Sequence, residues 1–180
     1  SVAYLASKRW TIFHCQVTSK IDSPAHAGEF FVDILQSIHM EDLMDKVQEV
    51  ELIPQDMPFL KFKDYFSETK LHYFPVMDQN QRLISIFSIN DVRGVLFSQE
   101  IEDLVVMKDI GTSNIIVTTP SEDLNTVLQK FTIKNIDSLP VVEEQDHSVL
   151  IGMLRRREVI AFYNEQVQKR KTGETENGLA

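Results

Sequence analysis

The sequence predicts an α+β fold in which two copies of a β-α-β-β-α unit pack as a pseudo-twofold pair, behind an N-terminal helical flank. Five landmarks of the first copy recur in the second at an offset of about 65 to 67 residues, which indicates a tandem repeat. Short apolar runs between turn signals predict the strands, and apolar residues at helical spacing predict the helices. We therefore divide the chain into a flank (1–39), a first unit (40–105), a second unit (106–168) and a disordered tail (169–180).

The composition is that of a globular protein, with 43% hydrophobic and 25% charged residues. The formal net charge is -9 and the isoelectric point is near 5.0. A nucleic acid is therefore not the expected partner, since phosphate backbones attract basic faces. Cys15 is the only cysteine, so no internal disulfide can form and a reducing compartment is the simplest expectation.

The amino-terminal region contains no apolar run long enough to cross a bilayer and no signal peptide. Because the chain begins at Ser1 in a stretch that reads as helix, we expect a fragment of a longer protein. The cluster Lys8-Arg9-Trp10 is typical of a membrane–water boundary, but a terminal amphipathic helix explains it equally well. A turn-rich connector at 22–28 and an amphipathic helix at 29–38 follow.

Each repeat is expected to begin with a short helical segment and a strand that a proline ends, followed by a helix, a β-hairpin and a closing helix. In the first unit these elements are predicted at 40–44, 50–54, 57–69, 73–77, 82–87 and 88–97, with a linking helix at 100–105. In the second unit they are predicted at 107–110, 115–120, 124–131, 138–142, 149–154 and 155–163.

The return strand of the first unit runs into its closing helix at Ser88, with Asp91 in the first helical turn. A serine and an aspartate at this spacing form an ordinary helix cap. The same hydroxyl, carboxylate and free backbone N–H groups could also hold a sugar and its phosphate. Both interpretations stay open for this motif taken alone.

The repeat resembles the CBS domain, of which two copies form a CBS pair or Bateman module. The resemblance rests on Phe74-Pro75-Val76 and Leu139-Pro140-Val141, on the polar hairpins that follow them, and on the strand that enters Ser88 to Asp91. It covers roughly residues 40–168 and implies a regulatory module with two quasi-equivalent clefts between the units.

The flank resembles the junction between the last membrane helix and the CBS pair in CLC-type chloride channels and transporters. The resemblance rests on Thr11-Ile12-Phe13 and on residues 22–30. It implies that the flank ends the last membrane helix of a parent protein and leads into the pair. In that family a tyrosine hydroxyl faces the central chloride, whereas Phe13 has no hydroxyl, so that hydrogen bond would be absent here.

The CBS resemblance implies one cleft that binds an adenine nucleotide. An aspartate would grip the ribose, hydroxyl and amide groups would help with phosphate, and apolar residues would enclose the adenine. The candidate residues are Ser88, Asn90, Asp91, Ile116, Thr118, Thr119, Ile136, Asp137 and Ser138. Asp137 is unfavourable near a phosphate unless a cation intervenes.

The second cleft would use residues 152–158, with Leu71, His72 and Tyr73 from the first unit. Arg155 stands where the family has serine or threonine, and Glu158 stands where it has aspartate, so we interpret this cleft as degenerate. Its three consecutive arginines could bind phosphate, or could form salt bridges to Glu143, to Glu144 or to a dimer mate.

Nothing in the sequence suggests catalysis, because the histidines lack metal-ligand spacing, Cys15 has no neighbouring base and no phosphate-binding glycine loop occurs. The first hypothesis is a nucleotide-sensing module on the cytoplasmic face of a membrane, attached to a CLC-type transport domain of the same chain. The second is a ligand-free homodimerisation module that associates through CBS helices near 59–66, 92–97 and Phe131. The third is a CBS pair from another transporter or an enzyme.

Overall fold

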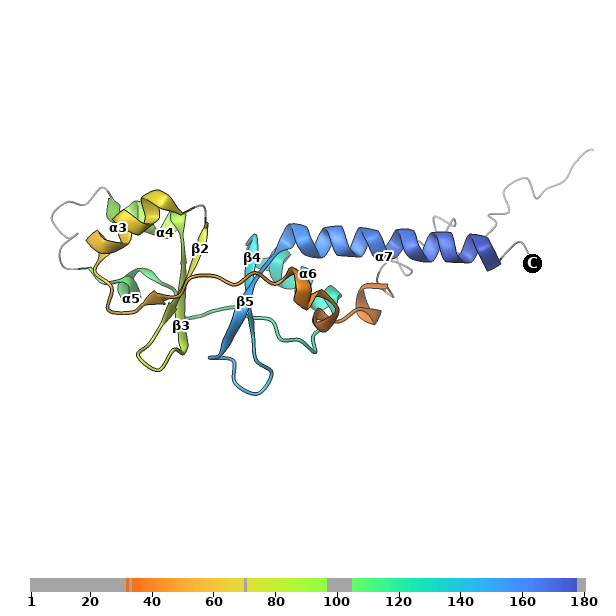
Figure 1. Cartoon of the computed structure of the whole chain (residues 1–180), viewed down its shortest axis with the longest axis horizontal. Coiled ribbons are helices and arrows are strands. Elements are labelled where there is room, and N and C mark those ends of the chain that lie inside the picture. Colours follow the sequence, from red (N-terminus) through yellow and green to blue (C-terminus); the bar gives the residue numbers. More distant parts are fainter. Residues whose placement is uncertain (1–31, 33, 70, 97–104, 178–180) are drawn as a thin grey trace, which may run out of the picture. The chain divides into compact units, whose positions relative to one another are not determined.

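The computed structural model of the chain describes residues 32, 34–69, 71–96 and 105–177 (Figure 1). The chain divides into two units, residues 1–34 and residues 35–180, and the second contains both repeats. Most predictions for the flank, and the predicted linking helix up to residue 104, lie outside the described residues. The described part of the predicted helix at 29–38 is helical at residues 32 and 34–37.

The second compact unit contains two small β-sheets with their helices (Figure 1). The first repeat forms η2 (Met40–Lys46), β1 (Ile53–Pro54), α3 (Phe59–Glu68), β2 (Tyr73–Met77), β3 (Leu83–Ser88) and α4 (Ile89–Leu96). The second repeat forms α5 (Met107–Ile110), α6 (Leu124–Lys134), β4 (Ser138–Val142), β5 (Leu150–Arg155) and α7 (Arg156–Asn177). β1 pairs in parallel with β2, whereas β2–β3 and β4–β5 are antiparallel hairpins.

The α+β class and both hairpins are confirmed, but the predicted strand at 115–120 is wrong. Only Thr118 of this segment reaches the sheet, through a parallel bridge to Val141. The segment leaves the sheet because the next backbone groups bond elsewhere, and the carbonyl of Pro120 accepts a hydrogen bond from the Glu41 N–H. The first strand of the first repeat is also shorter than predicted and comprises only β1.

The predicted disorder of the tail is wrong for residues 169–177, because α7 continues to Asn177. The sequence from Gln166 to Lys171 contains good helix formers. The Lys169 ammonium also pairs with the Glu165 carboxylate one turn earlier, at 2.7 Å. The lack of apolar residues in the tail therefore does not predict whether its backbone is helical.

The hydrophobic core around the first β-sheet is rich in aromatic side chains. Phe74 and Phe87 lie opposite each other on β2 and β3, and their rings stack at 5.1 Å with an angle of 19°. Phe62 of α3 meets both rings edge-on, also at 5.1 Å. All three side chains are fully or almost fully buried. Each such ring pair adds about 0.5–1.5 kcal/mol beyond the area that it buries.

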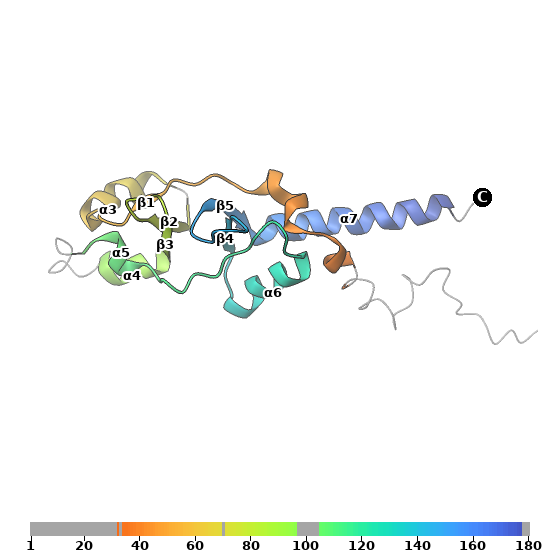
Figure 2. The same ribbon diagram turned by 90° about the horizontal axis from the view of Figure 1, so that it is seen from below.

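The short helix that opens each repeat packs against the other repeat. Met107 of α5 lies in the aromatic core of the first half, and its N–H donates to the Met57 carbonyl. Conversely, η2 of the first repeat packs beside α7 of the second repeat, and the Met40 N–H donates to the Glu122 carbonyl at 2.8 Å. Figure 2 shows the segment that carries η2 beside β5 and α7 instead of beside β2. The two repeats therefore exchange their opening segments.

Each exchanged segment, the one that contains Gln48 and the one that contains Thr112, extends the hairpin of the other repeat by one pair of backbone hydrogen bonds. Gln48 and Met153 exchange two bonds of 2.9 Å, and Ile86 and Thr112 exchange bonds of 3.1 and 2.9 Å. These contacts are equivalent under the repeat, since Met153 and Ile86 occupy corresponding places on β5 and β3. The exchange is therefore held by main-chain bonds that do not depend on particular side chains.

A glycine lies at each of these two contacts. At one contact it belongs to the hairpin, and at the other it belongs to the exchanged segment. At one crossing Gly152 of β5 faces the exchanged segment, where an added Cβ would lie 2.7 Å from both the Gln48 oxygen and Val47 Cγ1. At the other, Gly111 belongs to the exchanged segment, and an added Cβ would overlap the Ser85 side chain of β3. At each contact, one of the two residues that face each other must therefore be glycine. The two glycines are not at equivalent positions of the repeat, so a comparison of the two repeats in sequence does not reveal this requirement.

We predict that Gly152→Ala lowers the free energy of unfolding by about 1–3 kcal/mol, because the new methyl group meets backbone that cannot move aside. Gly111→Ala should also destabilise, but should cost clearly less in a Ser85→Gly background, where the β3 partner no longer has a side chain. Chemical denaturation of the two single variants and the double variant measures this coupling. Additive losses for Gly111→Ala and Ser85→Gly would contradict the steric explanation.

Candidate functional site: a pocket between the two repeats

The two hairpins are joined to each other at their turns. Met77 and Leu83 of the first hairpin form a buried cluster with Val142 of the second. The Leu83 N–H donates to the Ser148 carbonyl at 2.7 Å. Above this cluster, the Arg82 guanidinium contacts Asp146 Oδ2 at 3.0 Å and donates to Ser148 Oγ at 2.9 Å. Ser148 also donates to the Asp146 carboxyl, and its hydrogen bonds, followed by the charge of Arg82, lower the pKa of that carboxyl.

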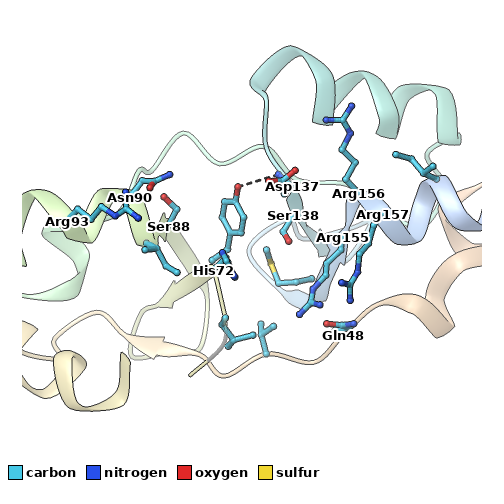
Figure 3. A pocket seen from close by; sticks show the side chains of 16 residues that line it. Gln48, His72, Ser88, Asn90, Arg93, Asp137, Ser138, Arg155, Arg156 and Arg157 are labelled. Carbon is cyan, nitrogen blue, oxygen red and sulfur yellow. Dashed lines mark hydrogen bonds between the residues drawn. The ribbon is translucent and has the colours of Figure 1, made fainter. Parts of the chain in front are cut away.

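At the other end of the hairpins the two repeats enclose a pocket of about 610 Å³ (Figure 3). Its walls include the last pairs of both strand ladders, Tyr73 with Ser88 and Ser138 with Arg155. Residues from the exchanged segment also contribute. The complete lining is Gln48, Val50, Leu71, His72, Tyr73, Ser88, Ile89, Asn90, Arg93, Asp137, Ser138, Met153, Arg155, Arg156, Arg157 and Ile160.

Tyr73 reaches across the pocket from one repeat to the other. Its phenolic oxygen accepts a hydrogen bond of 3.3 Å from the Asp137 N–H (Figure 3). The Asp137 carbonyl accepts the N–H of Arg156 at 2.9 Å, which attaches the turn before β4 to the start of α7. Tyr73 is half-buried and lines the pocket, and an aromatic ring in such a wall can stack on a planar group.

Four arginines and one aspartate carry the charge of the lining, in a chain whose formal net charge is -9. Within the described part of the chain, the guanidinium groups of Arg93, Arg155 and Arg156 have no hydrogen bond or ion pair. Arg157 pairs only with its neighbour Glu158, at 2.9 Å. In Figure 3, Arg155 and Arg157 point toward the side where Gln48 lies, Arg156 points the opposite way, and Arg93 stands beside Asn90 on the other repeat. Such unneutralised guanidinium groups favour an anionic ligand.

The motif at Ser88 forms a helix cap. The Asp91 carboxylate accepts the Ser88 N–H at 2.7 Å and the Ser88 hydroxyl at 2.8 Å, which closes the turn between β3 and α4. Asp91 is exposed and is absent from the pocket lining, whereas Ser88 and Asn90 line it. Both bonds end on Oδ2, so the helix start uses one oxygen of the carboxylate that was expected to hold a ribose.

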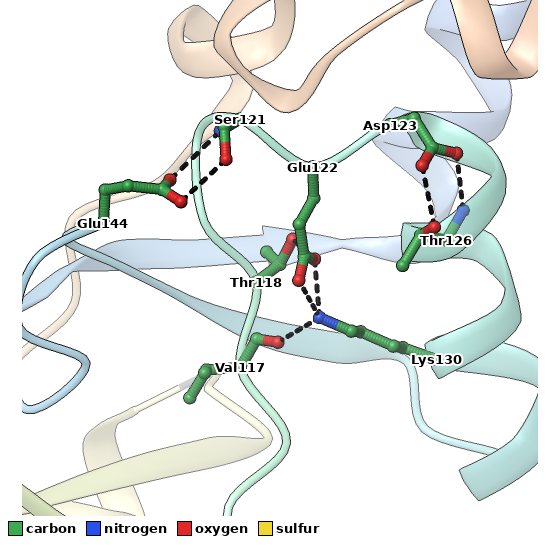
Figure 4. Close-up of polar contacts among 8 residues, drawn as sticks. All are labelled: Val117, Thr118, Ser121, Glu122, Asp123, Thr126, Lys130 and Glu144. Atoms are coloured by element: carbon green, nitrogen blue, oxygen red, sulfur yellow. Dashed lines mark hydrogen bonds and ion pairs between the residues drawn. The ribbon is translucent and has the colours of Figure 1, made fainter.

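The hydroxyl expected from the second repeat is also occupied (Figure 4). Thr118 is fully buried and donates to Glu122 Oε2 at 2.8 Å. Lys130 of α6 binds the same carboxylate and donates to the Val117 carbonyl at 2.7 Å. This network holds the loop before α6, and Asp123 caps that helix by accepting the Thr126 N–H at 3.0 Å. Thr118 therefore contributes to packing and not to the pocket wall.

Of the nine candidate residues, the structure brings four to the pocket, namely Ser88, Asn90, Asp137 and Ser138. The other five, Asp91, Ile116, Thr118, Thr119 and Ile136, lie outside its lining. Of the ten residues assigned to the cleft interpreted as degenerate, seven line the pocket, including Tyr73 and Arg155; Gly152, Leu154 and Glu158 do not. Sequence reasoning missed Gln48 and Val50, because a motif comparison gives no sign that the exchanged segment reaches the pocket. It also missed Arg93, which follows the Ser88 motif on α4.

The salt bridges suggested for the three arginines are not formed with Glu143 or Glu144 within the described residues. Glu144 instead accepts the Ser121 hydroxyl at 2.7 Å (Figure 4). Hydrogen bonds from Ser121 and then Thr119 hold the pKa of the Glu144 carboxyl below its usual range.

The surface suggested for dimerisation is largely internal. Phe59, Phe62, Val92 and Phe131 are fully buried within one chain, so these side chains cannot form a contact with a partner. The reason is that the apolar faces of these helices cover the two sheets. Among the described residues of α3, α6 and α7, the large apolar side chains that are exposed are Leu60, Ile133 and Ile160.

The comparison with protein families identifies this architecture. The CBS domain description matches residues 40–98 and again residues 107–165. The chain therefore belongs to the CBS-domain family, as a tandem pair. CBS domains are regulatory, are generally non-catalytic and commonly dimerise as pairs. No curated protein matches the chain.

Solved structures show the same fold at low sequence identity. The CBS domain of a CBS-domain-containing membrane protein from Sphaerobacter thermophilus is 18% identical, with a TM-score of 0.55, over 76% of this chain and 94% of that chain. CBSX2, solved in complex with AMP, is 22% identical, with a TM-score of 0.59, over 70% and 97%. The CBS pair of protein MJ0100, solved with 5'-methylthioadenosine and S-adenosyl-L-methionine, is 16% identical, with a TM-score of 0.56, over 69% and 96%.

Among the described residues, no helix has both the length and the apolar character that crossing a membrane requires. In the same part of the chain, no three histidine, cysteine, aspartate or glutamate side chains gather as a metal site.

Proposed function

We propose that this CBS pair is a regulatory module that senses an adenine nucleotide in the pocket between its repeats. The observation that carries the proposal is the set of four arginines in the lining, three of them without a partner among the described residues. Two solved structures of the same fold were determined with adenosine-containing ligands, which is consistent with this class of ligand.

The proposed contacts follow from the chemistry of the lining. Arg155 and Arg157 bind phosphate oxygens, because a guanidinium group matches two such oxygens at once. The Tyr73 ring stacks on the base. Ser88, Asn90 and Ser138 supply hydroxyl and amide groups for the sugar. A ribose contact by Asp91 stays a prediction, and Ser88 already uses one of its two carboxylate oxygens, Oδ2.

A ligand can regulate only if it prefers one arrangement of the repeats over another. The pocket supplies that preference, because Arg93 belongs to the first repeat and Arg155 to the second. An anion that contacts both draws the two walls together. The alternative of a ligand-free structural module predicts no such coupling. We also propose that the chain is not an enzyme.

We predict that ATP, ADP or AMP binds the purified chain and that Arg155→Gln weakens binding about tenfold or more, since hydrogen bonds to charged groups contribute about 1.5–3 kcal/mol. Isothermal titration calorimetry measures the affinities, with Arg170→Gln as a matched control outside the pocket. Asp91→Asn, included as a second variant, tests the ribose contact separately. Absence of heat with every nucleotide would favour the ligand-free alternative.

We propose further that the module forms a homodimer through its CBS helices, using exposed apolar side chains such as Ile133, which is 75% exposed. Light scattering should give the mass of two chains for the wild type and a lower mass for Ile133→Glu, because a buried unpaired carboxylate is costly. Leu52→Glu, at an exposed apolar position outside these helices, serves as control. A one-chain mass at all concentrations would contradict the dimer.

Finally, we propose that the chain belongs to a CLC-type chloride channel or chloride/proton antiporter, as the cytoplasmic domain beneath a membrane transport domain. The support is the sequence of the flank, Thr11-Ile12-Phe13 with residues 22–30. In liposomes, the complete parent protein should transport chloride, nucleotide should change the flux, and Arg155→Gln should reduce that change. A parent protein that does not carry chloride would rule out this assignment while leaving the nucleotide site intact.

A further inference from the structure

We infer that the exchange between the repeats opens on one side only, through local detachment of the α5 segment (residues 105–112), while the η2 segment (residues 38–48) stays in place. The detached state keeps both hairpins and the rest of each repeat folded. This property is separate from the proposed ligand site and does not depend on it. Three features distinguish the two segments, namely the lengths of their backbone hydrogen bonds, the support of the loops that receive them, and a buried hydroxyl group at one contact.

Both exchanged segments form equivalent backbone hydrogen bonds, so the two sets can be compared bond by bond. The distances, with the η2 bond first, are 2.8 and 3.1 Å for Met40–Glu122 and Met107–Met57, 2.9 and 3.2 Å for Glu41–Pro120 and Lys108–Gln55, 2.9 and 3.0 Å for Leu124–Ile38 and Phe59–Val105, 2.9 and 3.1 Å for Met153–Gln48 and Ile86–Thr112, and 2.9 Å for the reverse bond of both last pairs. None of these bonds is shorter in the α5 segment. Because hydrogen bonds weaken as the N···O distance grows past about 3.0 Å, the backbone holds the α5 segment less strongly.

The loop that receives the η2 segment is fixed by side chains (Figure 4). The carboxylate of Glu122 accepts the Thr118 hydroxyl at 2.8 Å and pairs with the Lys130 ammonium. The backbone carbonyl of the same glutamate receives the η2 segment. The equivalent positions of the first repeat carry Met57, Ile53 and Tyr65. Methionine and isoleucine side chains donate no hydrogen bond, so this network has no counterpart at the loop that receives the α5 segment.

The contact between the α5 segment and β3 buries a hydroxyl group that has no partner. Ser85 is 4% exposed, and its Oγ forms no hydrogen bond within the described part of the chain. Gly111 of the α5 segment lies directly against it. The equivalent position on β5 is Gly152, which has no side chain to bury. An unpaired buried hydroxyl is unfavourable, and it regains hydrogen bonds to water once the segment that covers it moves away. This penalty falls on the α5 segment alone.

The side that opens lies away from the pocket. Gln48 and Met153, which join the η2 segment to β5, both line the pocket. Thr112 and Ile86, which join the α5 segment to β3, are not part of the lining. Detachment of the α5 segment withdraws Met107 from the aromatic core around the first β-sheet and leaves the backbone contact beside the pocket closed. The pair can therefore loosen its first repeat without opening the pocket wall.

Amide hydrogen exchange of the full 180-residue chain, followed by NMR, measures this local detachment. After correction for intrinsic rates, we expect Met107 to exchange at least about tenfold faster than Met40, because a penalty on one segment lowers the cost of its opening. The same ratio is expected between Thr112 and Gln48. Ser85→Ala should slow the exchange of Thr112 by about fivefold or more, since it removes the unpaired hydroxyl group, and should leave Gln48 unchanged.

Thr118→Val is the matched contrast, because it removes a buried hydroxyl group that has a partner and supports the other loop. This variant should speed the exchange of Met40 and leave that of Met107 unchanged.

Met40 and Met107 also provide a second readout, because both are fully buried and each is the first residue of the opening helix of its repeat. Hydrogen peroxide transfers one oxygen to an exposed thioether, which becomes a sulfoxide, and is itself reduced to water. Peptide mass spectrometry should show Met107 oxidised at least about fivefold faster than Met40. Equal exchange of the two segments, which unfolding of the whole pair alone would produce, would overturn the inference. So would an unchanged Thr112 rate in Ser85→Ala, or oxidation of Met40 as fast as that of Met107.

Discussion

The exchange of opening segments between the repeats is the constraint on which the rest of this structure depends. Each half completes its core and extends its hairpin with residues from the other repeat, as Met107 and the pair Gln48–Met153 show. Neither half can therefore bury its apolar surface or satisfy its backbone groups alone. The exchange also brings Gln48 and Val50 into the wall of the pocket, so the site is a product of the same contacts that hold the fold.

Much of the fold could be predicted from the sequence because its signals are local. The two proline-containing strands and the α5 segment have the predicted bounds, since their apolar pattern and flanking turns lie within a few residues. The exchange could not be predicted, because it depends on contacts between residues far apart in the chain. The lost strand near Thr118 has the same origin, since its neighbours bond to η2 from the other repeat.

The site was predicted less well than the fold for a chemical reason. A motif identifies residue types, but whether a carboxylate is available depends on its neighbours. Asp91 and Thr118 have suitable groups, but Ser88 engages one oxygen of Asp91, Glu122 accepts the Thr118 hydroxyl, and neither residue lines the pocket. The arginines at the start of α7 depart from the family pattern, and the structure leaves Arg155 and Arg156 unpaired among the described residues. The pocket lining thus contains arginines that depart from the motif, whereas the aspartate that agrees with it lies outside the lining.

The contact between Arg82 and the second hairpin has a mechanical consequence. It fixes the two hairpins at their turns, while the pocket opens at the far ends of the same strands. A small rotation of one hairpin about this fixed point produces its largest displacement at the pocket walls and its smallest at the turns. Each strand thus acts as a lever arm, and its five- or six-residue length sets how far the walls separate for a given angle.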